Sequence, residues 1–193
     1  WEVADVNGDG RPDLVCGGWK SQVYCFPGRA DGKFDAPHEL RTADGHELEF
    51  PGVFPFPHFA DMNGDGAPDL LLSSEDGTLG CAYNSAKRGE AVRLAAPVAL
   101  MEQRSHLNGG ALTIPVAVDW DGDGLIDILG GAANGRVYFW KNIGNADVPV
   151  YRNPVELAAG GRPLVWRAGP DGSIQGDQEN DWGYLNVEVA DWD

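Results

Sequence analysis

Short apolar runs separated by turns recur along the chain, and they predict strands rather than helices. Three segments are each apolar, pass through a turn and become apolar again: "DLVCGGWKSQVYCF" (13–26), "DLLLSSEDGTLGCAY" (69–83) and "DILGGAANGRVYFW" (127–140). Asp76-Gly77 and Asn134-Gly135 are typical of two-residue hairpin turns, in which both central positions need positive φ. No long stretch has the apolar period of 3.6 residues that indicates a helix. We therefore expect an all-β fold built from hairpins.

Pairing outward from these turns predicts one register shared by all three hairpins. The predicted pairs are Leu72 with Cys81, Gly130 with Phe139 and, around a Lys20-Ser21 turn, Cys16 with Cys25. At such a non-hydrogen-bonded pair the Cα atoms approach to about 4.5 Å, the short end of disulfide geometry. A Cys16–Cys25 bridge is therefore compatible with this register. The alternative is that the three cysteines are small apolar core residues.

An Asp- and Gly-rich loop precedes each hairpin and sets the repeat. The loops are "DVNGDGRPD" (5–13), "DMNGDGAPD" (61–69) and "DWDGDGLID" (119–127), with a truncated fourth copy, "DWD", at 191–193. Their first aspartates are 56, 58 and 72 residues apart. Strand-like segments precede the loops ("WEVA", "PHFA", "PVAV", "NVEVA"), and others follow the hairpins ("APHEL", "AAPVAL", "NPVELA"). Four short strands and one loop per repeat predict the blade of a β-propeller.

The pattern Asp-x-(Asp/Asn)-Gly-Asp-Gly-x-x-Asp followed by a strand, once per blade, resembles the FG-GAP/VCBS repeats of integrin α-chain heads and of large secreted bacterial proteins. Residues 135–164 also resemble the second half of such a bacterial blade. The resemblance covers nearly all of residues 1–193 and implies a partial propeller of about three to three and a half four-stranded blades, with one calcium loop per blade. Because propellers have four to eight blades, we expect a fragment of a larger ring of seven blades, whose remaining blades are its partners.

The loop composition fits calcium, which takes six to eight oxygen ligands at about 2.3–2.6 Å. A nine-residue loop offers side-chain oxygens at positions 1, 3, 5 and 9 and a backbone carbonyl at position 7. The predicted ligands are Asp5, Asn7, Asp9, the Arg11 carbonyl and Asp13; Asp61, Asn63, Asp65, the Ala67 carbonyl and Asp69; Asp119, Asp121, Asp123, the Leu125 carbonyl and Asp127; and, in the truncated copy, Asp191 and Asp193. One ion is expected in each of the three complete loops.

Two carboxylates about 5 Å apart repel by about 0.8 kcal/mol in water and about 3 kcal/mol at an effective dielectric of 20. Metal binding is therefore expected to be part of folding, and the third loop, which has four carboxylates, is expected to bind most tightly. An EF-hand does not fit, because loop position 12 is Cys16, Leu72 or Gly130 instead of Glu.

The charge balance limits the partners. The net charge is −16, with 30 acidic against 14 basic residues, which argues against nucleic acid. No apolar run approaches the roughly 20 residues that cross a bilayer, so membrane insertion is not expected. Loops with so few ligands should need calcium well above cytosolic levels, which suggests an extracellular, cell-surface or periplasmic location.

A long segment in the last repeat, within 167–186, combines acids with aromatic residues and is a candidate sugar site: Asp177, Glu179, Asp181, Trp182 and Tyr184. The alternative is that its aromatic residues pack between blades while its acids are solvated. We expect a secreted binding or adhesion scaffold for a protein or polysaccharide, with no assigned catalytic residue. The alternative function is part of a carbohydrate-active propeller enzyme such as a polysaccharide lyase, in which His46, His106, Arg104 and Tyr184 would gather.

Overall fold

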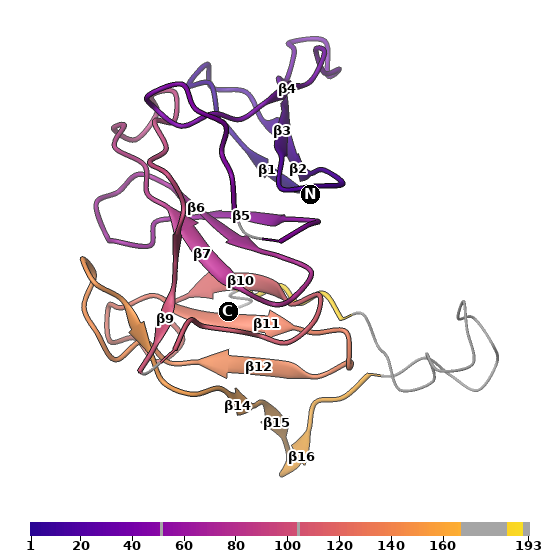
Figure 1. Cartoon of the computed structure of the whole chain (residues 1–193), viewed down its shortest axis with the longest axis vertical. Helices are drawn as coiled ribbons and strands as arrows, with labels where there is room; N and C mark the ends of the chain where they lie inside the picture. The colour runs from indigo at the N-terminus through magenta and orange to yellow at the C-terminus, as the bar shows by residue number, and fades with distance from the viewer. Residues whose placement is uncertain (51, 104, 167–184, 191–193) are drawn as a thin grey trace, which may run out of the picture.

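The fold is all-β over the residues that the computed structural model describes, which are 1–50, 52–103, 105–166 and 185–190 (Figure 1). Three four-stranded antiparallel sheets follow one another in chain order. The first contains β1 (Glu2–Ala4), β2 (Asp13–Gly17), β3 (Val23–Phe26) and β4 (His38–Glu39). The second contains β5 (Phe56–Ala60), β6 (Asp69–Ser73), β7 (Leu79–Ala82) and β8 (Val98–Ala99). The third contains β10 (Ile114–Val118), β11 (Asp127–Gly131), β12 (Val137–Trp140) and β14 (Val155–Glu156).

Each sheet is a meander whose strands pair in sequence order, so each is one propeller blade. All four strand-like segments of each blade lie where the sequence predicts them, which confirms the partial propeller. Two smaller pairings lie outside these sheets. β9 (Met101–Glu102), after the second blade, runs parallel to β13 (Val150–Tyr151) of the third blade, and β15 (Ala158–Ala159) forms a local hairpin with β16 (Arg162–Pro163). Within the described ranges no helix is long and apolar enough to cross a membrane.

The strand expected at "NVEVA" is wrong for the described residues, because 185–190 have no strand pairing. In the three blades the corresponding strand pairs with the strand after its Asp-rich loop. The segment nevertheless lies against the third blade, where the Leu185 amide donates to the Ala132 carbonyl at 3.4 Å.

The predicted hairpin register is wrong by one residue in every blade. Cys81 lies opposite Leu71 and Phe139 lies opposite Leu129. The reason is the turn. In the third hairpin the Gly135 amide donates to the Ala132 carbonyl and only Gly135, with φ of 73°, is left-handed. This is a three-residue loop with a bulged glycine, which shifts the pairing relative to a two-residue turn. The prediction that the three hairpins share one register is confirmed.

The corrected register separates the two cysteines of the first blade. Cys25 pairs with Val15, and Cys16 pairs with Tyr24, so the two side chains point to opposite faces of the sheet. Cys25 is buried, Cys16 is half-buried, and both are free thiols, as is Cys81. The expectation that Cys16 and Cys25 face each other is therefore wrong, and the core-residue alternative holds for Cys25 and Cys81.

The hydrophobic core lies between blades instead of within them. One cluster joins the first and second blades and includes Val15, Cys25, Leu70 and Leu72. A second cluster joins the second and third blades and includes Leu71, Cys81, Ile128 and Trp140. Alternate leucines of β6 therefore serve different cores, because successive side chains of a strand point to opposite faces. All five residues of β6 are buried, which is consistent with its three consecutive central leucines, Leu70–Leu72.

Small residues at the ends of the second strands let consecutive blades meet. A Cβ at Gly17 would lie 1.8 Å from the Pro55 carbonyl oxygen, and a Cβ at Gly131 would lie 2.1 Å from the Leu185 carbonyl oxygen. The same position in the second blade is Ser73, whose hydroxyl donates to the Thr113 carbonyl at 2.5 Å. Leu185 thus takes the place on the third blade that Pro55 and Thr113 take on the first and second blades.

Candidate metal centres

The Asp-rich loops connect the first and second strands of each blade and share one hydrogen-bond pattern. The carboxylate at position 1 accepts the backbone amides of positions 4, 5 and 6 at 2.8–3.1 Å in all three loops. These carboxylates belong to Asp5, Asp61 and Asp119. The glycines at positions 4 and 6 all have positive φ, between 74° and 89°, which a residue with a Cβ rarely adopts. The sequence therefore fixes a tight loop wrapped around its first carboxylate.

The carboxylate at position 9 anchors each loop in the interior. Asp13, Asp69 and Asp127 are fully buried. One oxygen accepts the amide of position 2, and the other accepts an amide of the connection after the third strand. In the second loop these donors are Met62 at 3.0 Å and Asn84 at 2.7 Å. The first and third loops repeat both bonds, with Val6 and Gly28 and with Trp120 and Asn142.

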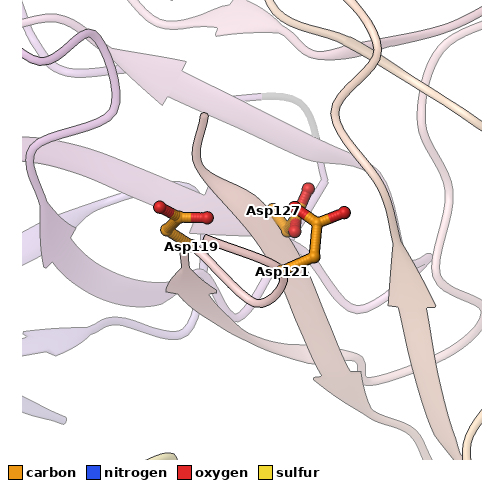
Figure 2. A group of neighbouring side chains, drawn as sticks. All are labelled: Asp119, Asp121 and Asp127. Carbon is orange, nitrogen blue, oxygen red and sulfur yellow. The ribbon is translucent and has the colours of Figure 1, made fainter. Parts of the chain in front are cut away.

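The oxygens of the third loop converge to a spacing that suits a metal ion. One ligand oxygen from each of Asp119, Asp121 and Asp127 lies within 4.8 Å of the others, and Figure 2 shows these three side chains around the loop. Calcium–oxygen bonds of about 2.3–2.6 Å place opposite ligands about 4.6–5.2 Å apart. The predicted ligands at positions 1, 3 and 9 are thus brought together here. The first and second loops have an amide oxygen, from Asn7 or Asn63, at position 3.

The side chain at position 5 has a structural bond in each loop. Its Oδ1 accepts the amide of position 7 at 2.8–2.9 Å, and this holds for Asp9, Asp65 and Asp123. The second carboxylate oxygen does not take part in this bond. In the second loop, the Oδ2 of Asp65 accepts the Asn63 side-chain amide at 3.1 Å. The bonds to the position-5 carboxylates hold the backbone of the position-7 residues, whose carbonyls are the predicted ligands: Arg11, Ala67 and Leu125.

The three loops differ in the cations that contact them. Arg11 pairs with Asp9 in the first loop. Lys141 contacts Asp121 and lies 2.8 Å from Asp123 in the third loop. No ion pair in the described part of the chain involves the carboxylates of the second loop. The count of four carboxylates in the third loop therefore overstates its negative charge, because a lysine offsets one of them.

The pKa values reflect these environments. Burial raises the pKa of Asp69 to about 6, and burial also raises the pKa of Asp127. The hydrogen bond from Lys141 lowers the pKa of Asp123, and the bonds to Asp121 and Asp123 raise the pKa of Lys141. Burial thus opposes ionisation of the position-9 carboxylate in the second and third loops, and a bound cation would favour it.

Sequence reasoning missed two residues that support the loops. Asn84 is buried, and its Oδ1 accepts the amides of Ala86 and Arg93 at 3.0 and 2.8 Å, while its Nδ2 donates to the Pro68 carbonyl. Asn142 makes the equivalent bonds in the third blade. The signal is positional: both asparagines follow the position-9 aspartate by 15 residues.

Several predicted site residues lie outside the described residues: Asp177, Glu179, Asp181, Trp182, Tyr184, Asp191 and Asp193, together with Arg104. Of the two histidines in the lyase alternative, His46 lines a surface cavity with Arg41, Glu47 and Glu49. His106 pairs with Met101 and is not among the residues that line this cavity.

Comparisons with known proteins agree with this architecture. The family model of the FG-GAP-like repeat matches residues 5–72. A sequence search of curated proteins finds no match. Among solved structures, the chain is similar to a lectin from Agrocybe aegerita, described as recognising non-reducing terminal N-acetylglucosamine, with a TM-score of 0.51 and 19% identity over 84% of this chain and 40% of that one. A chain of the Photorhabdus luminescens Tc holotoxin pore matches with a TM-score of 0.47 and 22% identity over 83% of this chain and 7% of that one. The chain thus spans less than half of either structure, and the similarity to the lectin concerns the fold alone.

Proposed function

Because the chain carries an FG-GAP-like repeat over residues 5–72 and folds as three blades of a partial propeller, we propose that it is a calcium-stabilised segment of an extracellular propeller that binds a protein or a polysaccharide. The observation that carries the calcium part is the convergence of Asp119, Asp121 and Asp127 oxygens within 4.8 Å. The lectin similarity supports the polysaccharide as ligand by analogy of fold.

Calcium suits the donor set better than the cations that prefer thiolate or imidazole ligands. The loops offer carboxylate, amide and carbonyl oxygens and no thiolate or imidazole, which is the hard-ligand set of calcium and magnesium. The position-1 carboxylates already hold the loop backbone, so little of the chain has to be reordered when an ion binds. Bound calcium would offset the mutual repulsion of the carboxylates and fasten the first strand of each blade to the second strand.

The residues on the outer face of the third blade support a partnership with further blades. Val15 and Leu71 pack into the first and second inter-blade cores, and Leu129 is their equivalent in the third blade. Leu129 lines a cavity of about 500 Å³ with Trp120, Val137 and Trp166. Trp120 and Trp166 are 49% and 55% exposed. A following blade would fill this face as the second and third blades fill the two faces before it.

The proposed extracellular location rests on the calcium affinity that we expect for the loops. The first two loops have an amide at position 3, and Lys141 offsets one carboxylate of the third loop. We therefore expect calcium dissociation constants in the range of extracellular modules, about 10⁻⁴–10⁻³ M. The experiment is calcium titration of the intact protein by isothermal calorimetry, with thermal melting in calcium and in chelator. We expect three sites per chain segment and a higher melting temperature in calcium. Identical melting with and without chelator would contradict the calcium proposal, and nanomolar affinity would contradict the extracellular one.

A further inference from the structure

A cleft of about 810 Å³ opens on the side of the blades opposite the Asp-rich loops. The loops join first to second strands, so the ends of the second strands and the starts of the next blades lie at the other edge. The cleft lies there, lined by Gly17 and Gly18 after β2, Phe54 and Phe56 at the start of the second blade, Glu75 after β6, and Leu112 before β10. Its volume is in the range of small-molecule sites.

Aromatic rings lie in and beside this cleft: Trp1, Phe54 and Phe56 line it, and Trp19 lies next to it through its contact with Phe54. Trp19 follows Gly18 at the tip of the first hairpin and is 78% exposed. Its ring centroid lies 4.8 Å from that of Phe54, with the ring planes 75° apart. An exposed tryptophan supported edge-on by a second ring is held in place at little conformational cost. The equivalents of Trp19 in the next two blades are Glu75 and Ala133, so this aromatic pair is a property of the first junction only.

The backbone of the cleft is fixed by contacts between blades. Phe54 and Leu112 occupy equivalent positions and both are left-handed, with φ of 53° and 56°, which bulky residues rarely adopt. The Glu75 amide donates to the Val53 carbonyl, and the Glu75 carbonyl accepts the Leu112 amide, both at 2.9 Å. The close approach of Gly17 to Pro55 fixes the other wall. Such a cleft is formed before a ligand arrives, which lowers the entropy cost of binding.

The charge of the cleft selects a neutral ligand. Among the described residues that line it there is no Lys, Arg or His, and Glu75 is exposed at its border. The whole chain has a net charge of −16. Uronates, phosphates and nucleic acids would therefore meet repulsion without a compensating cation. A carboxylate does accept hydrogen bonds from neutral hydroxyl groups, and these charge-assisted bonds are strong.

We propose that this cleft binds a neutral oligosaccharide, with Trp19 at its border as the apolar platform under a pyranose ring, Phe54 as the edge-on support of that platform, and Glu75 as the acceptor for the hydroxyl groups of the sugar. Sugar rings present an apolar C–H face and a rim of hydroxyls, which matches an aromatic pair beside a carboxylate. The inference rests on the polysaccharide ligand of the proposed function. It makes no use of the candidate sugar residues within 167–186.

The test is calorimetric titration of the intact protein, in calcium, with four neutral probes and one anionic probe: cellohexaose, mannohexaose, xylohexaose, N-acetylchitohexaose and hexagalacturonate. We expect at least one neutral probe to bind and hexagalacturonate not to bind. Trp19→Ala should weaken that binding about tenfold or more, the equivalent of one lost stacking contact. Glu75→Gln should weaken it less, because an amide oxygen still accepts. Phe34→Ala is the matched control, since Phe34 is a 50% exposed aromatic residue of the first blade outside the cleft.

Three results would overturn the cleft assignment: unchanged affinity in Trp19→Ala, binding of hexagalacturonate alone, or binding of none of the five probes. Calcium titration and melting of the same preparations keep the two proposals separate. If the protein binds calcium and is stabilised by it while Trp19→Ala has no effect on sugar binding, the cleft assignment fails and the calcium-stabilised scaffold stands. Equal melting temperatures of Trp19→Ala and the unmodified protein show that lost binding is not lost folding.

Discussion

Replacing Asn84 with Ala tests whether the loops depend on buried side-chain amides behind them. Asn84 is 4% exposed, and its side-chain oxygen accepts two backbone amides, from Ala86 at 3.0 Å and from Arg93 at 2.8 Å. Ala removes the Oδ1 that accepts both amides. A buried amide left without a partner costs about 1–3 kcal/mol. The Ala86 amide is buried and should show the full cost, whereas the Arg93 amide is partly accessible to water. We expect Asn84→Ala to lower the free energy of unfolding by about 2–3 kcal/mol.

The assay is urea unfolding followed by tryptophan fluorescence. With a urea dependence of about 1–3 kcal/mol per molar, the midpoint should fall by about 1 M. Ser85→Ala is the control, because its hydroxyl makes one exposed bond, to the Arg93 carbonyl at 3.2 Å. Its effect should stay within about 0.5 kcal/mol. Equal midpoints for the two variants would refute the reasoning. Asn84→Ala keeps the backbone amide that donates to Asp69, but it removes the side-chain bonds that hold this stretch of backbone. Calcium binding by the second loop should therefore weaken while the third loop is unchanged.

Three further outcomes follow from the structure. Lys141→Met removes the cation that contacts Asp121 and Asp123, so calcium affinity of the third loop, measured by calorimetry, should rise about tenfold; unchanged affinity would mean that the lysine turns away when the ion binds. Cys25 and Cys81 are buried, and burial raises the pKa of the Cys25 thiol to about 12; iodoacetamide at neutral pH should therefore label neither until urea unfolds the protein, as peptide mass spectrometry can check. In chelator, the Asp69 pKa of about 6 lies above its unfolded value of about 3.9, so the unfolded state binds fewer protons and stability from this group falls as pH rises from 4 to 7. Asp69→Asn should abolish that component in urea midpoints taken across this range, and a midpoint difference independent of pH would contradict it.

The blades could be predicted from the sequence because several signals agree. The Asp-rich loop and the apolar runs recur in all three repeats, and a hairpin glycine is added in the second and third. The turn type could not be predicted, since Asn134-Gly135 suits both a two-residue turn and a three-residue loop with a bulged glycine. Only the backbone distinguishes them, and the one-residue difference moves Cys25 away from Cys16.

The composition of the loops predicted the carboxylates but not the cations near them. Lys141 lies 14 residues beyond Asp127 and reaches Asp121 and Asp123 because β12 returns beside the loop. The equivalent positions in the other blades are Pro27 and Tyr83, so no repeated signal marks the lysine. The supporting amides of Gly28, Asn84 and Asn142 are backbone groups, which leave no trace in the sequence.

The alternating leucines of β6 couple the second blade to both of its neighbours. Leu70 and Leu72 pack into the core shared with the first blade, and Leu71 packs into the core shared with the third blade. A destabilising substitution in this one strand would therefore weaken both interfaces. A substitution in an outer strand would instead weaken only one interface between blades. Blades with an uncovered face should therefore unfold first. A further blade could be inserted only where both of its faces match the neighbouring blades.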